Sequence, residues 1–321
     1  MEYINYFLKS KSLIEFLNGL KNNGLKQAYL FSSNDKLENY ASCEILSLLI
    51  NCKNNLCLTC DSCIKILSGN SIDLKIYPKN KENNILVEDI EEIIDSCYVL
   101  PFENEYKIYI LNDFDKATIS SQNKFLKTLE EPPKSVIFLL NSQKPEMILD
   151  TIKSRCEKII LPPLKKEEIK DIIITNNIKF DEISLQNCEN EIGNYLTLTN
   201  TNFSNIFEFC LDMLKNMNLS SEILFYASQI LKDKANLENY FKSLIIIFND
   251  VLRVKYNENQ IKNKSKLKDI ILLSQKFSEK AVNEILLNII KYNKALSFNT
   301  NENLVVDALL INILEEKHKW N

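Results

Sequence analysis

Hydrophobic residues in the first half of the chain form short runs that polar or turn residues separate. Segments with helical spacing lie between these runs, as at Leu86, Ile90 and Ile93. Runs of this length, bounded by such residues, are typical of buried strands. Strands and helices that alternate in this way predict a parallel α/β sheet. The predicted strands cover residues 28–31, 74–77, 107–111, 136–140 and 159–161.

The second half has a different pattern and almost no helix breakers. All 7 prolines lie between Pro78 and Pro163, and Gly193 is the only glycine after Gly69. Apolar residues recur there at helical spacing, which predicts a nearly all-helical region. The double proline Pro162-Pro163 marks one boundary, and the polar segment TNTNFS marks a weaker one. We therefore predict three domains: an α/β domain at 1–164, a small helical domain at 165–204 and a helical bundle at 205–321.

The overall composition disfavours a membrane protein, a secreted protein and a protein that binds DNA by its overall charge. Apolar residues make up 45% of the chain and charged residues 26%, as in ordinary globular proteins. The first residues, MEYINYFLKS, lack the pattern of a secretory signal, and no apolar run is long enough to span a bilayer. We expect a cytoplasmic protein. A net charge of -4 provides no overall field for DNA, so contact with nucleic acid would be local or made by partners.

Four of the 9 cysteines stand close together, as Cys52-x4-Cys57-x2-Cys60-x2-Cys63. Four thiolates can complete a tetrahedral shell around zinc, which leaves no position for water and indicates a structural ion. The residues between them are polar, which disfavours free cysteines of a core, and a redox role is a further alternative. Because the first spacing is short, Cys43 could also replace Cys52.

Arginine is rare among the basic residues. Of the 39 lysines and arginines, only Arg155 and Arg253 are arginine, so each raises the question of whether guanidinium geometry is needed. Arg253 is interpreted as a packing or interface residue. The single histidine, His318, lies near the end of the chain and gives no support for a catalytic triad.

Three motifs carry a resemblance to a known family. The run LKTLEEPP that begins at Leu126, the segment VIFLL that begins at Val136, and Ser154-Arg155-Cys156 followed by LPPL resemble bacterial DNA polymerase III clamp-loader subunits, both tau/gamma and delta-prime. The segment QAYLFS looks like the first strand of that family, and the cysteine cluster falls where the family inserts a zinc module. The resemblance implies an AAA+ domain of the P-loop type, a helical lid and a C-terminal helical collar.

The resemblance also implies a role for Ser154 and Arg155. In the family, the arginine of this motif reaches ATP bound to a neighbouring subunit as an arginine finger. A guanidinium can stabilise the charge that develops on the γ-phosphate, and its planar fork suits this better than a lysine. We therefore expect Arg155 to act in trans, with Ser154 beside it.

The loop after the first strand departs from the family's nucleotide-binding pattern. Aligned with the family's glycine-rich loop, Ser33 and Glu38 replace the first and last glycines, Asn39 replaces the lysine, and Tyr40 replaces the Ser or Thr that holds magnesium. Asn112-Asp113 likewise stands where ATPases of the family have Asp-Glu. No ATP is expected in this site, and this loss selects delta-prime within the family.

The sequence therefore predicts a subunit that does not hydrolyse ATP itself but assists hydrolysis by a tau/gamma neighbour. Implied partners are the tau/gamma and delta subunits, with the sliding clamp and primed DNA reached through the complex. Two alternatives stay open. One is a tau/gamma-like ATPase with a degenerate loop, and the other is a zinc-containing binding module unrelated to replication.

Overall fold

A computed structural model describes residues 4–80, 84–257, 260–296 and 300–319. Two compact units divide the chain. The first unit comprises residues 1–180 with 190–194, and the second comprises 181–189 with 195–321.

The predicted boundary at Pro162-Pro163 falls inside the first unit, and the predicted lid at 165–204 is divided between the two units. The three-domain division stays a prediction. Each unit is therefore described by itself.

The first unit contains a five-stranded sheet in the order β2-β3-β4-β1-β5, and every neighbouring pair is parallel. Four of the predicted strands begin where expected, and the fifth begins two residues earlier, at Glu157. The alternation of short apolar runs with helices therefore gave the correct sheet. Its strands are β1 (Ala28–Ser32), β2 (Leu74–Tyr77), β3 (Lys107–Leu111), β4 (Val136–Ser142) and β5 (Glu157–Ile160).

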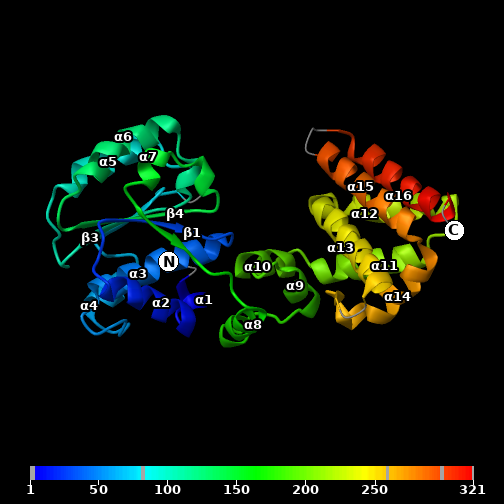
Figure 1. The fold of residues 1–321 in the computed structure, drawn as a ribbon, viewed down its shortest axis with the longest axis horizontal. Helices are drawn as coiled ribbons and strands as arrows, with labels where there is room; N and C mark the ends of the chain where they lie inside the picture. Colours follow the sequence, from blue (N-terminus) through cyan, green and yellow to red (C-terminus); the bar gives the residue numbers. More distant parts are fainter. Residues whose placement is uncertain (1–3, 81–83, 258–259, 297–299, 320–321) are drawn as a thin grey trace. The chain divides into compact units, whose positions relative to one another are not determined.

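Helices cover both faces of this sheet, with α5, α6 and α7 on one face and α1 to α4 on the other (Figure 1). Phe125 of α6 packs edge-on against Phe138 of β4, with ring centroids 5.1 Å apart, in the core beneath the first group. A parallel sheet buried in this way fits an AAA+ type fold. The helices are α1 (Ile4–Phe7), α2 (Lys11–Asn22), α3 (Lys36–Asn51), α4 (Asp61–Leu67), α5 (Val87–Cys97), α6 (Ile119–Glu130), α7 (Asp150–Lys153) and α8 (Lys166–Thr175).

Helix ends follow ordinary capping chemistry. Helix α3 begins after Asp35, whose side chain accepts from the Leu37 N–H, and α6 begins after Thr118, which accepts from the Ser121 N–H. Helix α6 ends at Glu130, just before the double proline that the sequence predicts as its stop.

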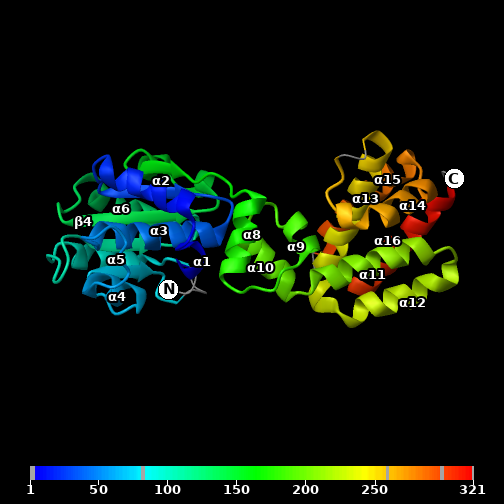
Figure 2. The same ribbon diagram turned by 90° about the horizontal axis from the view of Figure 1, so that it is seen from below.

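The second unit consists of helices, as the scarcity of prolines and glycines predicts, and the described residues after β5 contain no strand (Figure 2). Helix α16 packs against α12 and α15. None of the described helices is long and apolar enough to cross a membrane. The remaining helices are α9 (Glu182–Asn187), α10 (Ile192–Asn200), α11 (Phe203–Asn216), α12 (Ser220–Lys232), α13 (Leu237–Tyr256), α14 (Leu267–Lys276), α15 (Glu279–Leu296) and α16 (Glu302–Lys319).

Candidate functional site

The predicted degenerate nucleotide loop lies between β1 and α3, where a P-loop protein binds phosphate. The amino end of a helix attracts anions, because its first N–H groups lack partners within the helix and the helix dipole is positive there. In this chain the acidic group at that helix end is a side chain of the protein itself. The Asp35 carboxylate accepts hydrogen bonds from the N–H of Leu37 at 2.9 Å and from the N–H of Gly193 at 3.1 Å.

Asp35 is buried, and burial raises the pKa of its carboxyl group, although the N–H groups of Gly193 and Leu37 oppose the shift. Gly193 is needed for this contact. A Cβ atom at that position would lie 2.8 Å from the Asp35 Oδ1 atom and 3.3 Å from the Leu37 Cγ atom. The lone glycine of the second half therefore lets the backbone reach the degenerate loop.

Glu38 adds a second carboxyl group beside the first. Its side chain is only 2% exposed, and the Ser33 hydroxyl donates to it at 2.5 Å. Burial, together with the negative charges of Asp35 and Glu168, raises the pKa of Glu38 to about 7, while the Ser33 hydroxyl lowers it. Two acidic groups thus occupy the region where a nucleotide phosphate would need positive charge.

Asn39 and Tyr40, which stand at the positions of the family's lysine and Ser or Thr, contact groups inside the protein. The Asn39 amide donates to the backbone oxygens of Ser33 at 2.9 Å and Ser142 at 3.1 Å, which joins the ends of β1 and β4. Tyr40 is buried, and the Lys36 ammonium lies 5.2 Å from the centre of its ring. The ammonium of Lys36, at the start of α3, therefore has an internal partner.

Asp113, the acidic residue after β3, also has partners inside the protein. Asp113 forms ion pairs with Lys36 at 2.8 Å and with Lys116 at 2.7 Å. Burial alone would raise the pKa of Asp113, but the two lysines outweigh it and hold the pKa below its ordinary value. Asn112 accepts from the Asn141 amide at 2.5 Å. Among the described residues, neither Asp113 nor Asp115 joins a group of three metal-ligating side chains.

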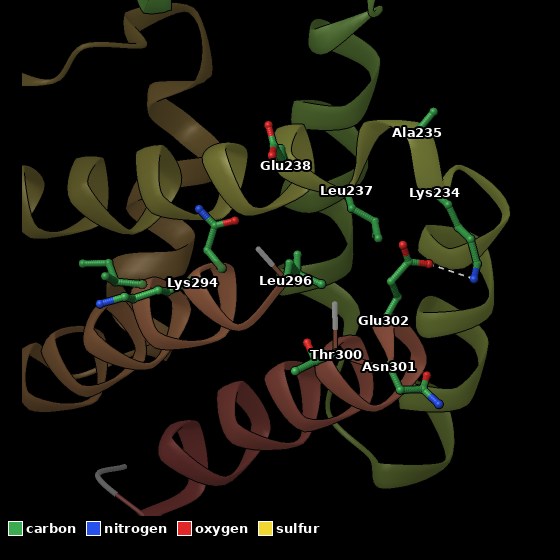
Figure 3. A pocket seen from close by; sticks show the side chains of 11 residues that line it. Lys234, Ala235, Leu237, Glu238, Lys294, Leu296, Thr300, Asn301 and Glu302 are labelled. Atoms are coloured by element: carbon green, nitrogen blue, oxygen red, sulfur yellow. Dashed lines mark ion pairs between the residues drawn. The ribbon is translucent and has the colours of Figure 1, made fainter. Parts of the chain in front are cut away.

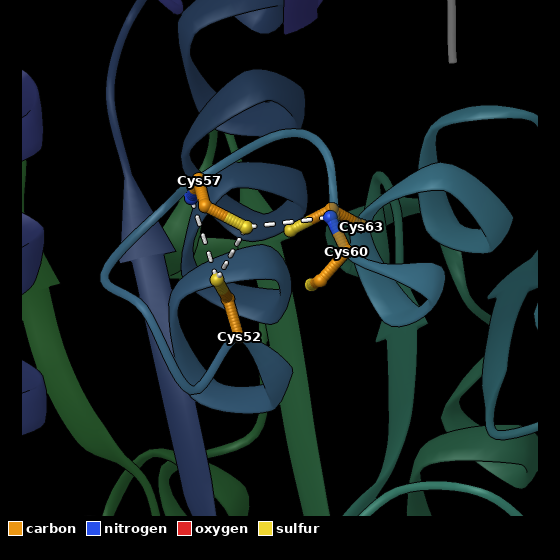
Figure 4. A group of neighbouring side chains, drawn as sticks. All are labelled: Cys52, Cys57, Cys60 and Cys63. Atoms are coloured by element: carbon orange, nitrogen blue, oxygen red, sulfur yellow. Dashed lines mark hydrogen bonds between the residues drawn. The ribbon is translucent and has the colours of Figure 1, made fainter.

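The predicted cysteine site lies at the opposite end of α3 (Figure 4). Cys52 directly follows that helix, Cys57 lies in the loop, and Cys60 and Cys63 begin the helix α4. Their four Sγ atoms all lie within 4.8 Å of one another. The structure therefore brings the four predicted ligands together.

The geometry of this cluster fits a tetrahedral metal site. Zn–S bonds of about 2.3 Å imply S···S separations of about 3.8 Å, and the Sγ atoms of Cys52 and Cys57 lie 3.6 Å apart. The short loop closes because Asn55, Leu56 and Leu58 have positive φ angles of 46°, 62° and 59°. The donor set of four thiols fits a structural zinc ion with no open position.

Hydrogen bonds to sulfur prepare the cluster for a metal ion. The N–H groups of Cys57 and Cys60 donate to the Sγ atoms of Cys52 and Cys57, both at 3.4 Å. The N–H groups of Thr59 and Cys60 lower the pKa of Cys57 to about 6, which favours the thiolate. Cys43 is not an alternative ligand, since it is buried beside the Asn141 amide at 3.6 Å.

Arg155 follows the short helix α7 and is about one-third exposed, with a side-chain exposure of 32%. Its guanidinium donates to Glu130 at 2.5 Å and to the Thr151 backbone oxygen at 2.7 Å. The Ser154 hydroxyl donates to the same Thr151 oxygen at 3.0 Å, whereas Cys156 is buried. The SRC motif therefore anchors its cysteine in the core and holds its arginine at the surface.

Arg253 lies in the second unit and pairs with a buried carboxylate. It donates to the fully buried Asp250 at 2.7 Å. Asp250 also accepts from the backbone N–H and the side-chain amide of Asn263 at 3.1 and 2.8 Å. The arginine thus balances a buried carboxylate that orders the residues after α13, in agreement with a packing role.

A cavity of about 870 Å³ opens in the second unit between α13, α15 and the start of α16 (Figure 3). Lys234 and Glu302 form an ion pair of 2.8 Å at its edge, so their charges neutralise one another. Among the described residues that line it, none is a cysteine or histidine. Nothing in this lining indicates a particular chemistry.

Two features escaped prediction from the sequence. The first is Asp35, although an aspartate just before a helical segment is a known N-cap signal. The second is a buried carboxylate, Asp73, which accepts from the N–H groups of Phe102 and Glu103 at 2.7 and 2.8 Å. No local pattern marks the second, because its partners lie about thirty positions away in the chain.

Comparison with known proteins gives a consistent result. Residues 8–165 match the family model described as "DNA polymerase III, delta subunit". The gamma subunit of DNA polymerase III from Buchnera aphidicola subsp. Baizongia pistaciae is 31% identical over 268 residues, which cover 78% of this chain and 69% of that subunit.

Two further relatives differ in length. The delta' subunit of Bacillus subtilis is 24% identical over 309 residues, which cover 93% of this chain and 94% of that subunit. The tau/gamma subunit of Haemophilus influenzae is 33% identical over 176 residues, and the match spans only 25% of its length. Together these matches exclude the alternative of a zinc-containing binding module unrelated to replication. Because these matches agree, and one relative is 31% identical over 69% of its own length, this chain belongs to the family of bacterial DNA polymerase III clamp-loader subunits.

Proposed function

We propose that the chain is a delta-prime-like subunit of the clamp loader, which does not hydrolyse ATP itself and lends Arg155 to ATP on a neighbouring tau/gamma subunit. The observation that carries this proposal is the internal carboxylate at the amino end of α3. Asp35 accepts the N–H hydrogen bonds that a nucleotide phosphate would need there.

Electrostatics support a site that excludes ATP. A triphosphate would have to displace Asp35 from the N–H groups of Leu37 and Gly193 and approach the buried carboxyl group of Glu38, and neither acidic group can compensate the charge of a phosphate. The lysine that normally neutralises the β- and γ-phosphates is replaced by Asn39, whose amide already bonds two backbone oxygens. Binding of ATP would thus break internal contacts without gaining the usual cation.

The surroundings of Arg155 support a role toward a neighbour. Its guanidinium is held by Glu130 and the Thr151 oxygen, and about a third of the side chain stays accessible. An arginine held in this way loses less conformational freedom when it meets a phosphate than a free one would. In phosphoryl transfer such an arginine is worth about 10³ to 10⁵ in turnover.

The partners and cofactor follow from the same proposal. The chain would assemble with tau/gamma and delta subunits through its helical second unit, and the complex would load the sliding clamp on primed DNA. The four cysteines Cys52, Cys57, Cys60 and Cys63 would hold one structural zinc ion.

The test is ATP turnover in the presence of sliding clamp and primed DNA. We expect the isolated chain to be inactive, and a reconstituted loader that carries Arg155→Lys to lose turnover at least about 100-fold. Arg253→Lys is the matched control, because this arginine pairs with a carboxylate inside the second unit. Full turnover with Arg155→Lys would refute the role in trans.

A second candidate is a motor ATPase of the tau/gamma kind with an altered loop. The 31% identity to a gamma subunit favours it. Magnesium-dependent ATP turnover by the isolated chain would establish this alternative and refute the non-hydrolysing role.

A further inference from the structure

Lys21, in the last turn of α2, contacts the carboxyl end of α3. Its ammonium donates to the backbone oxygen of Leu49 at 2.5 Å and to that of Cys52 at 3.4 Å. The last C=O groups of a helix lack partners within the helix, and the helix dipole is negative there. Cys52 is the residue directly after α3 and the first cysteine of the cluster (Figure 4). Lys21 therefore contacts the backbone of one of the four cysteines that the fold brings together.

The positive charge of Lys21 has no acidic partner in the described part of the chain. Both oxygens that its ammonium contacts belong to neutral carbonyl groups, and no described carboxylate forms an ion pair with it. The side chain is half-buried. An ammonium that has lost part of its hydration is stabilised by negative charge close to it. Lys21 is thus a cation whose surroundings leave room for further negative charge.

A cysteine cluster filled with zinc supplies such charge. Four thiolates around one Zn²⁺ leave two negative charges uncompensated. Residues 52–63 cannot balance them, because Lys53 and Asp61 are the only charged residues in this segment and cancel one another. Lys65, on α4, already pairs with Glu103 at 2.5 Å. A compensating cation therefore has to come from outside the segment that carries the four cysteines.

We propose that Lys21 compensates the charge of the cysteine site: its ammonium, held at the end of α3, stabilises the zinc-bound form and raises the affinity of the four cysteines for zinc. The inference rests on the zinc ion of the proposed function but not on the role of Arg155. Groups outside the ligand sphere commonly change the affinity for a metal ion by about 10- to 100-fold. The coupling runs through charge and a backbone oxygen, and it needs no bond from Lys21 to sulfur.

The test is the dissociation constant of the full chain for Zn²⁺, measured by competition with a chelator near neutral pH. Lys21→Met keeps a long side chain but removes its charge, and we expect zinc to bind at least about 10-fold more weakly. Lys21→Arg keeps the charge and should restore most of the affinity. Lys26→Met is the matched control, because Lys26 is an exposed lysine that follows the same helix. We expect it to leave zinc binding unchanged.

A second measurement separates the effect of charge from the packing of α2. If Lys21 served only to hold α2 against α3, Lys21→Met would lower the midpoint of thermal unfolding equally with and without zinc. We expect a larger fall in the zinc-loaded chain, because a ligand that binds less tightly stabilises the folded state less. An equal fall in the two forms would overturn the inference.

Asp61→Asn provides the opposite change and does not depend on the folding of Lys21→Met. Asp61 lies between Cys60 and Cys63 in the first turn of α4, so this variant removes a negative charge from the cluster's own segment. Zinc should then bind more tightly than in the wild type. Unchanged or weaker binding in Asp61→Asn would contradict an electrostatic role for Lys21.

The remaining outcomes are distinct. Equal zinc affinity in Lys21→Met and the wild type, or an equal loss in Lys26→Met, would overturn the inference. A loss in Lys21→Arg as large as that in Lys21→Met would do the same, because charge would then not be the cause. A wild-type chain that binds no zinc would refute the zinc part of the proposed function, and this inference with it. Weaker binding in Lys21→Met, with Lys21→Arg and Lys26→Met close to the wild type, would support both.

Discussion

The two ends of helix α3 carry the two clusters of this protein that bear on its chemistry, and they contrast sharply. At the amino end, Asp35 and Asn39 bond to the protein's own backbone, and an external anion finds no free donor among these contacts. At the carboxyl end, Cys52 and its three partners hold their sulfur atoms at metal-binding separation. The groups at one end are bonded within the protein, and those at the other have the geometry of a metal site.

The two ends differ in what their polar groups contact. At the amino end, internal groups fill the hydrogen-bonding positions, because buried N–H groups without partners are costly. At the carboxyl end, four thiols converge at separations that suit a metal ion. Four sulfur atoms this close gain little from one another without a metal ion.

The largest effect is expected from removal of one cysteine of the cluster at the carboxyl end of α3. Cys57→Ser should reduce the zinc content from about one ion per chain to near zero, because a tetrahedral thiolate site with one ligand lost binds far more weakly. Structural zinc contributes on the order of 10 kcal/mol in small metal-binding peptides, so the midpoint of thermal unfolding should also fall. Metal analysis and calorimetry measure the two effects.

Cys43→Ser is the matched control for the zinc prediction. Cys43 lies within α3, accepts a hydrogen bond from the Asn141 amide and takes no part in the cluster. Full zinc content is expected in this variant. If Cys57→Ser retained its zinc, the assignment of the four ligands would be wrong.

The next effect concerns Glu38, whose pKa rises from 4.5 to about 7 in the folded protein. The folded state holds this proton more tightly than the unfolded state does. The contribution of Glu38 to stability is therefore fully present below pH 4.5 and is lost as the pH rises through 7. Glu38→Gln removes this dependence and should raise the free energy of unfolding at pH 8 by about 3 kcal/mol, with little effect at pH 4.

Chemical denaturation at several pH values measures this difference. Glu146→Gln is a suitable control, since Glu146 is exposed on the same unit. An equal gain at pH 4 and pH 8 would mean that the proton of Glu38 does not cause it.

The smallest effect concerns Asp35. Asp35→Ala removes the cap of α3 and should cost about 1 to 2 kcal/mol, whereas Asp35→Asn should cost less because asparagine also caps helices. Hydrogen exchange at the Gly193 amide should rise in Asp35→Ala, because that amide loses its acceptor. Unchanged exchange at Gly193 would show that the carboxylate does not hold this segment in solution.

The sequence predicted the sheet, the helical second half and the four cysteines that the fold brings together, because each depends on local signals. Short apolar runs indicate buried strands. The spacing of Cys57, Cys60 and Cys63 indicates that their sulfur atoms converge on one point. The absence of the nucleotide lysine at position 39 was equally visible. The internal partner at the amino end of α3 was not visible, because the contact of Asp35 with Gly193 joins residues 158 positions apart. Pairings at that separation depend on the fold as a whole.

The separation between Asp35 and Gly193 has a consequence for synthesis of the chain. The amino end of α3 leaves the ribosome 158 residues before the amide that completes its contacts. At about 5 to 20 residues per second, this delay is roughly 8 to 30 seconds. Through that interval the Asp35 carboxylate can bond with Leu37 of its own helix but lacks the Gly193 N–H. The contact with Gly193 forms only after that residue has been synthesised, so the amino end of α3 gains its last partner late in translation.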